Sequence, residues 1–268
     1  MESLQKTPGV VAETDSGCLN DHMRRALLGL CLVALAGCSF RNVSCGLPPP
    51  ATTQAPAAGP TAVTGARSAD PAEVARTKIV FLGDSLTSGF GLLTNQAFPA
   101  KVEALFAAEG YGEVEAVNAG VTADTTAGGL RRVEQVLESD VKILVVALGG
   151  NDALRGLTVG QTHDNLAAII NLARGRGVHV VVCGMEAPTN LGEDYREGFR
   201  AVYLRLRNEF PKDVVHIPFL LEGVAGQAAL NQADGIHPTE EGAQKIAEML
   251  YPKLRDVVDQ LPSGGGGG

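Results

Sequence analysis

A serine, an aspartate and a histidine stand in polar segments whose residue types and spacing are typical of a chemical site. Ser85 belongs to the G-D-S-L motif at 83–86, which directly follows the apolar run 78–82. Far downstream, Asp234 and His237 lie three positions apart in a polar segment. An imidazole with a pKa of about 6.5 can take the proton of a serine hydroxyl, and a carboxylate fixes the imidazole tautomer. These residues predict nucleophilic catalysis, with Ser85 as nucleophile, His237 as base and Asp234 as the acid that orients it.

Two further polar segments can supply hydrogen-bond donors to a tetrahedral intermediate. Residues 118–126 and 149–152 each follow a β-branched apolar run, as Ser85 does. Since parallel strands end at one edge of a sheet, these segments can meet Ser85 there. Losing one oxyanion donor typically costs a few kcal/mol of barrier. We expect the backbone N–H groups of Ser85 and Ala123 and the side-chain amide of Asn151 to form the oxyanion hole.

Short apolar runs alternate with helical periods from Thr77 onward, and this alternation must position the polar segments. The runs expected to be strands are 79–82, 114–117, 143–148 and 178–183, with a weaker candidate at 214–217. Apolar residues at helical spacing occur at 98–106, 130–137, 166–173, 199–206 and 246–257. Strict alternation of strand and helix predicts a central parallel sheet with right-handed crossovers, that is, a three-layer α/β/α sandwich.

Taken together, these segments resemble the four sequence blocks of the SGNH hydrolases, the GDSL lipase/esterase family. The blocks stand in the order of the family: Gly83-Asp84-Ser85-Leu86, Asn118 to Thr126, Gly149-Gly150-Asn151-Asp152 and Asp234-Gly235-Ile236-His237-Pro238. Residues 77–261 are especially similar to the branch of arylesterases and multifunctional thioesterase I/lysophospholipases. The resemblance implies a flavodoxin-like fold and hydrolysis of esters or thioesters through an acyl-enzyme, and it implies no cofactor.

Ala123 departs from the family pattern, because the second block normally has glycine at this position. A backbone N–H is the expected donor, so alanine can supply it, provided that the turn does not require a positive φ. A positive φ would strain the turn and weaken the oxyanion hole. We expect activity to persist with Ala123.

Other polar residues of the blocks are expected to have structural roles. Asp84 is expected to bond the amides of the turn that carries the nucleophile. Asp124 is expected to cap the helix that follows it, and Asp152 to be a turn or helix-capping residue. Among the five histidines, only His237 combines a nearby acid with a loop setting.

The segment 185–192, after the fourth expected strand, resembles the mobile substrate loop of the thioesterase I branch. The residues expected to flank the acyl group are Met185, Glu186, Pro188, Asn190 and Leu191. Because no cluster of charged residues forms a clamp for a phosphate or a sugar, we expect aryl or acyl esters with an apolar acyl chain, including lysophospholipids and thioesters. The alternatives are a carbohydrate deacetylase of the same fold and a noncatalytic binding module that kept the fold. A flavodoxin-like nucleotide domain is disfavoured, because Thr94 stands where a G-x-G-x-x-G pattern needs its third glycine.

Composition limits the class of protein further. The chain has 268 residues, 45% of them hydrophobic, which suffices for one good core. Its net charge of −8, its pI near 5.2 and the lack of a basic run argue against a nucleic-acid partner. No spacing among cysteines and histidines suggests a metal site. We expect a monomer that acts on a small-molecule or lipid ester.

The first part of the chain has the pattern of a bacterial lipoprotein. Residues 23–37 have the charged start and short apolar middle of a signal peptide, and Leu35-Ala36-Gly37-Cys38 resembles a lipobox. The alternative is an ordinary signal peptide cleaved near a cysteine by chance. We expect an upstream extension at 1–22, lipidation at Cys38, a disordered Pro/Ala-rich tether at 38–76, the hydrolase domain at 77–261 and a disordered glycine tail at 262–268. The protein would be anchored in the bacterial cell envelope and face the periplasm.

Overall fold

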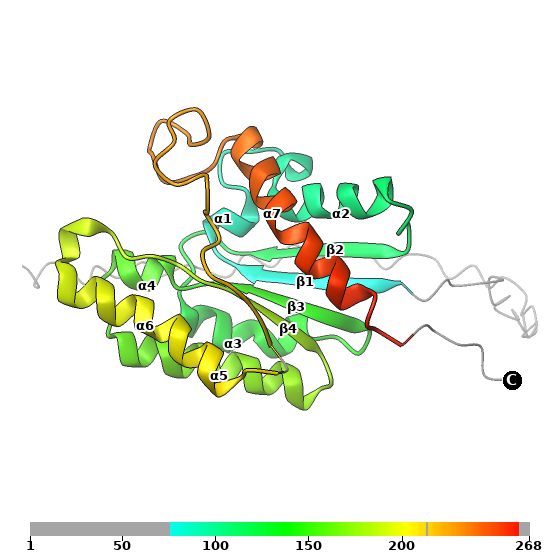
Figure 1. The fold of residues 1–268 in the computed structure, drawn as a ribbon, viewed down its shortest axis with the longest axis horizontal. Coiled ribbons are helices and arrows are strands. Elements are labelled where there is room, and N and C mark those ends of the chain that lie inside the picture. The colour runs from blue at the N-terminus through cyan, green and yellow to red at the C-terminus, as the bar shows by residue number, and fades with distance from the viewer. Residues whose placement is uncertain (1–75, 213, 263–268) are drawn as a thin grey trace, which may run out of the picture. The chain divides into compact units, whose positions relative to one another are not determined.

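Residues 76–212 and 214–262 are described by a computed structural model, whose centre is a five-stranded sheet (Figure 1). All strand pairs are parallel, and the order across the sheet is β2-β1-β3-β4-β5. The strands are β1 (Thr77–Gly83), β2 (Val114–Gly120), β3 (Val141–Ala147), β4 (His179–Cys183) and β5 (Val214–Ile217). Every expected strand is present, the weak candidate included. The predictions for Cys38, the signal segment, the tether up to residue 75 and the glycines of the tail lie outside the described residues.

Helices cover both faces of this sheet, as Figure 1 shows. One layer contains α1 (Ser85–Ser88), α2 (Phe98–Ala108) and α7 (Glu240–Val258); the other contains α3 (Thr126–Val136), α4 (Gly150–Leu154), α5 (Val159–Gly175) and α6 (Glu193–Glu209). Two short 3-10 turns are η1 (Thr94–Gln96) and η2 (Thr189–Leu191). The expected three-layer α/β/α sandwich is confirmed. Among the described residues, no helix combines the length and the apolarity needed to cross a membrane.

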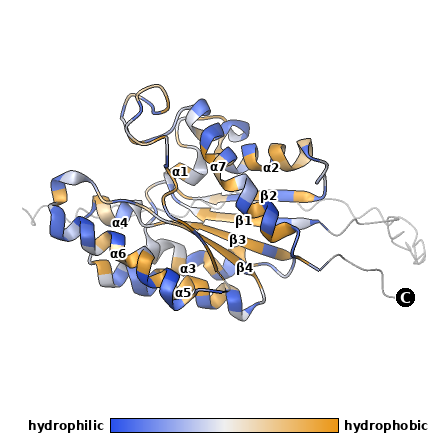
Figure 2. Cartoon of the chain, in the orientation of Figure 1, coloured by the Kyte–Doolittle hydropathy of each residue, from blue (hydrophilic) through white to orange (hydrophobic). Residues whose placement is uncertain are grey.

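The core lies on both sides of the inner strands β1 and β3, and Figure 2 shows the strongly apolar colouring of these strands. In β1, Ile79 and Phe81 are completely buried, and in β3 the whole run 143–147 is buried. A strand covered by helices on both faces cannot alternate apolar with polar side chains, because each face is core. The uninterrupted apolar runs of the sequence therefore form the inner strands of the sheet.

The order of the strands creates a crevice at the carboxyl edge of the sheet. From β1 the chain crosses to β2 on one side, and from β2 it returns past β1 to β3 on the other side. The connections that leave β1 and β3 therefore diverge, which is where open α/β sheets bind ligands. Ser85 follows β1 and Asn151 follows β3, so the fold brings both residues to this crevice.

Candidate active site

Ser85, His237 and Asp234 form one hydrogen-bonded line at the carboxyl edge of the sheet. His237 Nε2 lies 2.9 Å from Ser85 Oγ, and His237 Nδ1 lies 2.6 Å from Asp234 Oδ2. Ser85 is the first residue of α1, whereas the other two lie in the connection 218–239 between β5 and α7. The imidazole therefore bridges the nucleophilic hydroxyl and the carboxylate, as a base that is oriented by an acid must do.

The Asp234 carboxylate is fixed by its own turn as well as by the imidazole. Its Oδ1 accepts the backbone N–H groups of Ile236 at 2.9 Å and His237 at 3.0 Å. Gly235, between Asp234 and Ile236, has a φ of 70°, a conformation that costs glycine little. The hydrogen bond from the His237 side chain, followed by the two backbone bonds, lowers the pKa of Asp234 to about 2. The carboxylate is therefore ionised at neutral pH and can stabilise an imidazolium.

An aromatic contact that the sequence did not suggest supports the imidazole from another side. The Phe90 ring lies against His237, with ring centroids 4.7 Å apart and planes tilted by 39°. Gln232 Nε2 donates to the carbonyls of Phe90 at 2.7 Å and Pro238 at 2.9 Å. The segment that carries the base is thereby joined to the loop after α1. These contacts follow no short motif, so only the folded chain reveals them.

Asp84 links the nucleophile to the expected amide donor. This buried carboxylate accepts the Leu86 N–H at 3.0 Å through Oδ1 and Asn151 Nδ2 at 3.1 Å through Oδ2. Burial raises the pKa of Asp84 to about 6, against the lowering effect of those two hydrogen bonds. Asp84 bonds the turn as expected, and it also orients the Asn151 amide, which the sequence analysis did not foresee.

Ala123 has a φ of 63° and is the single non-glycine residue with a positive φ in the described part of the chain. The turn is closed by a bond from Asp124 N to Val121 O at 3.0 Å, and Arg155 Nη2 donates to Ala123 O at 2.7 Å. A left-handed conformation costs a non-glycine residue about 1–2 kcal/mol. The condition under which alanine would strain the oxyanion turn is therefore met.

The role predicted for Asp124 is wrong, because Thr125 caps α3 instead. Thr125 Oγ1 accepts the Gly128 N–H at 3.3 Å. The Asp124 carboxylate instead accepts the N–H of Thr125 itself at 3.1 Å through Oδ1 and Arg132 Nε at 2.8 Å through Oδ2. Asp152, as expected, holds a helix start, since its Oδ2 accepts the Thr126 N–H at 2.9 Å.

Arg132 is a site residue that the sequence analysis missed. Its Nη1 donates to Ala119 O at 2.6 Å and its Nη2 to Gly83 O at 2.8 Å, in addition to the Asp124 ion pair. A single guanidinium thus joins the ends of β1 and β2 to the turn that carries Ala123. An arginine on a helix gives no signal in the sequence for contacts of this kind.

A cavity of about 490 Å³ is lined by Ser85 and His237 and by the other two expected oxyanion residues, Ala123 and Asn151. From the expected substrate loop, Met185, Glu186 and Pro188 line this cavity. Asn190 and Leu191 do not line it, because they lie in η2, past the point where the loop turns toward α6. The wall also includes residues to which the sequence analysis gave no part in the site, namely Leu154, Ala187, Phe219, Leu221, Ala225 and Ile236.

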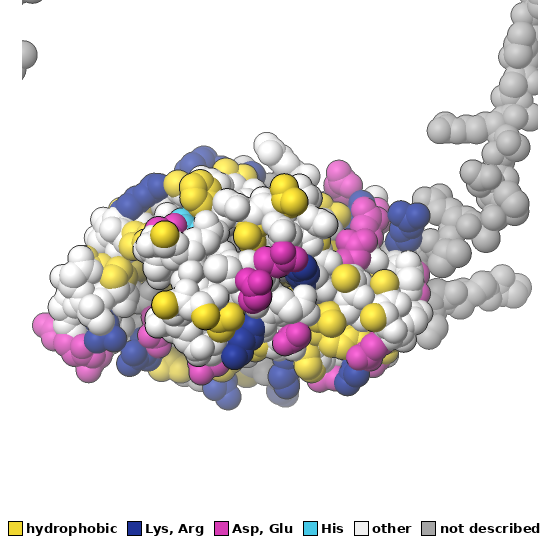
Figure 3. Space-filling model, turned by 90° about the horizontal axis from the view of Figure 1, so that it is seen from above, with side chains coloured by type: hydrophobic (Ala, Val, Ile, Leu, Met, Phe, Trp, Pro, Cys, Tyr) yellow, Lys and Arg dark blue, Asp and Glu magenta, His cyan; other side chains and the backbone are white. Residues whose placement is uncertain are grey.

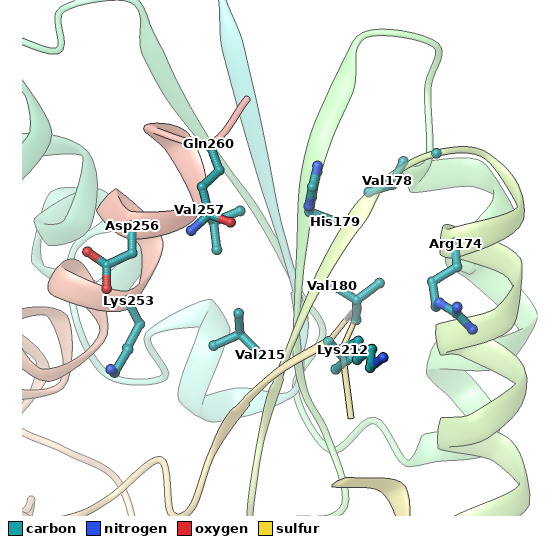
Figure 4. Close-up of a pocket in the computed structure, with 12 residues that line it drawn as sticks. Arg174, Val178, His179, Val180, Lys212, Val215, Lys253, Asp256, Val257 and Gln260 are labelled. Carbon is teal, nitrogen blue, oxygen red and sulfur yellow. The ribbon is translucent and has the colours of Figure 1, made fainter. Parts of the chain in front are cut away.

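A larger cavity, of about 670 Å³, lies at the amino ends of β4 and β5 and carries none of the expected site residues (Figure 4). Figure 4 shows Arg174, His179 and Lys253 as separate groups around its rim. Within 76–212 and 214–262, the serine, histidine and aspartate of the expected relay converge at the carboxyl edge and not at this cavity, so chemistry rather than size locates the site. The described residues contain no group of three or more His, Cys, Asp or Glu side chains that could hold a metal ion.

Comparison with known proteins agrees with this geometry. Residues 81–245 match the model of the GDSL-like lipase/acylhydrolase family, which is more than half of the chain. The chain belongs to this family. "Esterase TesA" of Pseudomonas aeruginosa is 36% identical over 187 residues, which are 69% of this chain and 92% of that protein. "Thioesterase 1/protease 1/lysophospholipase L1" of Escherichia coli is 32% identical over 182 residues, 68% of this chain and 85% of that protein.

Solved structures give the same result. A crystal structure of TesA has a TM-score of 0.63 and 37% sequence identity, and the match covers 68% of this chain and 99% of that one. AlinE4, an esterase of the SGNH-hydrolase family, has a TM-score of 0.56 at 37% identity, with coverage of 70% and 97%. The resemblance seen in the four sequence blocks is thereby confirmed, and the chain is a GDSL-type serine hydrolase.

Proposed function

We propose that this serine esterase hydrolyses carboxylic esters with an apolar acyl group, including aryl esters and lysophospholipids, through an acyl-enzyme on Ser85. The observation that carries the proposal is the continuous line from Asp234 through His237 to Ser85, which opens into a cavity with a mostly apolar wall. Relatives named as esterase, arylesterase and thioesterase/lysophospholipase support this substrate class. We include thioesters with an apolar acyl group among the proposed substrates.

In the acylation step, Ser85 Oγ attacks the carbonyl carbon of the ester while His237 Nε2 takes the proton of the Ser85 hydroxyl. The oxyanion accepts hydrogen bonds from the Ser85 and Ala123 N–H groups and from the Asn151 amide. When the intermediate collapses, the bond to the leaving alcohol breaks, and the imidazolium returns its proton to that oxygen. Asp234, whose pKa is held near 2 by the His237 hydrogen bond, stays ionised and stabilises the imidazolium throughout.

Deacylation repeats the same sequence with water as the nucleophile. His237 takes a proton from the water, which attacks the acyl carbon of the ester on Ser85. The second oxyanion uses the same donors, and collapse releases the carboxylic acid while the proton returns to Ser85 Oγ. No group beyond these side chains and water is needed to balance either half of the reaction.

The cavity wall favours an apolar acyl group over an acetylated sugar. The wall facing Ser85 includes Leu154, Phe219 and Leu221, and no lysine or arginine lines it among the described residues. A sugar would leave its hydroxyl groups against this apolar surface without hydrogen-bond partners, which is unfavourable. Carbohydrate deacetylation is therefore the weaker candidate.

We also propose that the enzyme is attached to the cell envelope through a lipid on Cys38, facing the periplasm. The support for this is the pattern of residues 23–38, with its charged start, short apolar stretch and small residues before the cysteine. An enzyme held there meets membrane-derived esters more often than cytosolic thioesters.

The test is a chain-length profile of p-nitrophenyl esters from acetate to palmitate, alongside lysophosphatidylcholine and acetylated xylan. We expect kcat/KM to rise from acetate to medium-chain esters, with little release of acetate from xylan. Ser85→Ala is expected to lower kcat by about 10³-fold or more on every substrate. A marked preference for acetylated xylan, or ester hydrolysis that survives Ser85→Ala, would contradict the proposed function.

A further inference from the structure

Exposed apolar side chains line the catalytic cavity or stand within three residues of its lining in the chain. Among the large hydrophobic residues with high exposure, Phe90 (48%), Leu154 (53%) and Ile236 (48%) line the cavity themselves. Val121 (48%) directly precedes Thr122, which also lines it, and Leu93 (68%) follows Phe90 in the same loop. We call these five residues the apolar ring. Figure 3 shows a histidine beside an acidic side chain, with hydrophobic side chains next to it and others spread over the same face.

These side chains come from separate connections, so no single local pattern explains them. Phe90 and Leu93 follow β1, Val121 follows β2, Leu154 ends α4 after β3, and Ile236 precedes α7. Of the large hydrophobic residues found highly exposed in the described chain, only Leu204, on α6, lies outside this set. Single exposed apolar residues are ordinary, but apolar residues collected on one rim mark an interaction surface.

We propose that the apolar ring rests on the surface of a zwitterionic lipid membrane, from which the enzyme draws its ester substrate. This inference rests on the proposed function. Three members of the ring line the cavity that holds the Ser85 hydroxyl, so a protein partner or a second copy of this chain seated on them would close the entrance to substrate. A lipid surface can occupy the same position and deliver the substrate through it.

The charges at the mouth fit a zwitterionic surface better than an anionic one. Among the described residues, no lysine or arginine lines the cavity, and its acids are Asp84 and Glu186. The two arginines beside it are engaged, since Arg155 Nη2 donates to Ala123 O at 2.7 Å and Arg200 Nη2 lies 3.6 Å from Glu186 Oε1. Proteins bind anionic membranes through clusters of lysine and arginine. Helices that lie on such membranes carry these basic residues next to the apolar residues that enter the lipid. Binding is therefore expected to depend on apolar contact and only weakly on salt.

The proposed anchor on Cys38 is compatible with this orientation. The described domain begins at the amino end of β1, the opposite end of that strand from Ser85. The chain between Cys38 and Thr77 can extend to roughly 130 Å, whereas a seven-residue strand such as β1 is about 23 Å long. A connection of this length allows the mouth to face the same membrane that holds the anchor.

The test compares Leu93→Asp with the matched control Leu204→Asp, in the full chain carrying Cys38→Ser so that an anchor cannot mask weak binding. Leu93 does not line the cavity, and Leu204 is similarly exposed on α6. The two measurements are flotation with phosphatidylcholine vesicles and hydrolysis of lysophosphatidylcholine in those vesicles. We expect Leu93→Asp to need about tenfold more lipid for half-maximal binding and activity, because an apolar contact is lost and a charge meets the membrane. Leu204→Asp should match the parent chain.

Hydrolysis of soluble p-nitrophenyl acetate separates this inference from the proposed function. It should stay within twofold in both variants, since neither residue lines the cavity. If the parent chain hydrolyses the soluble ester but Leu93→Asp and Leu204→Asp behave alike on vesicles, the proposal that the apolar ring binds a membrane is wrong. The proposal is also wrong if sedimentation shows that the parent chain is a dimer and that Leu93→Asp dissociates this dimer. If the soluble ester is not hydrolysed at all, the proposed function fails, whatever the flotation shows.

Discussion

At the scale of the residue, Ala123 is the point where local backbone energy and catalysis meet. Its positive φ places a strained alanine in the turn that supplies an oxyanion N–H. Ala123→Gly removes the contact between Cβ and the backbone that makes this conformation costly, although glycine gains entropy in the unfolded state. We expect the free energy of unfolding to rise by about 0.5–1 kcal/mol.

Urea denaturation of the two proteins measures this change, and steady-state kinetics show its effect on the site. Because the N–H remains, kcat should stay equal or increase. Lower stability of Ala123→Gly would mean that the positive φ carries no strain, and an unchanged kcat with higher stability would mean that the strain does not reach the reaction.

Asp84 predicts a pH dependence of stability with a definite sign. Burial raises its pKa to about 6 in the folded protein, from 3.8, so the folded state binds a proton more tightly than the unfolded state. The stability it contributes is complete below pH 3.8 and is lost as the pH rises through about 6. The loss is about 3 kcal/mol, because each pKa unit corresponds to 1.36 kcal/mol.

The measurement is the difference in unfolding free energy between the wild type and Asp84→Asn from pH 4 to pH 7. This difference should fall with rising pH, since only the wild type titrates at this position. The test is how steeply this difference changes with pH. Its part that does not depend on pH also includes the hydrogen bonds to Leu86 and Asn151, which the asparagine amide alters. A flat difference would place the folded pKa of Asp84 near its ordinary value.

At the scale of the element, Arg132 holds the strand ends and the oxyanion turn together. Replacing it with methionine leaves the carbonyls of Gly83 and Ala119 and the Asp124 carboxylate without this donor. We expect kcat to fall about 10- to 100-fold with KM within twofold, because a displaced donor weakens the transition state more than substrate binding. The free energy of unfolding should fall by about 2–3 kcal/mol.

Arg131→Met is the matched control, since Arg131 is the exposed neighbour on the same helix. It should change neither kinetics nor stability appreciably. Arg132→Lys keeps the charge but cannot serve three acceptors with a planar fork, so it should recover only part of kcat. A normal kcat in Arg132→Met would show that the turn holds its own geometry without the guanidinium.

The elements themselves were predictable because a sheet buried on both faces needs continuous apolar runs. Their ends were less so. The strand expected at 114–117 continues to Gly120, since Asn118 and Ala119 pair with Phe81 and Leu82 of β1. The four polar blocks located the catalytic residues, but the wall from Phe219 and Leu221 lies in an irregular connection without periodicity. The contacts of Arg132 and Phe90 depend on tertiary packing, which no short pattern encodes.

At the scale of the whole molecule, the proposed lipid on Cys38 determines where the esterase works. Expressed with its full chain in a Gram-negative host, the protein should remain with the membrane fraction after an alkaline wash and incorporate labelled palmitate. Cys38→Ser should abolish the labelling and release the protein into the wash, because peripheral contact alone does not resist it. Equal labelling of the two proteins would exclude Cys38 as the modified residue.

The convergence of the Ser85 oxygen and the His237 imidazole at one reacting carbon is tested most directly by labelling with an organophosphonate that carries a p-nitrophenol leaving group. Mass spectrometry of the digested protein should find one phosphonyl adduct, on Ser85, in the wild type. Labelling should slow by about 10³-fold or more in His237→Ala, because the hydroxyl then lacks its base. An adduct on a different residue, or labelling of Ser85 at full rate without the imidazole, would contradict the account.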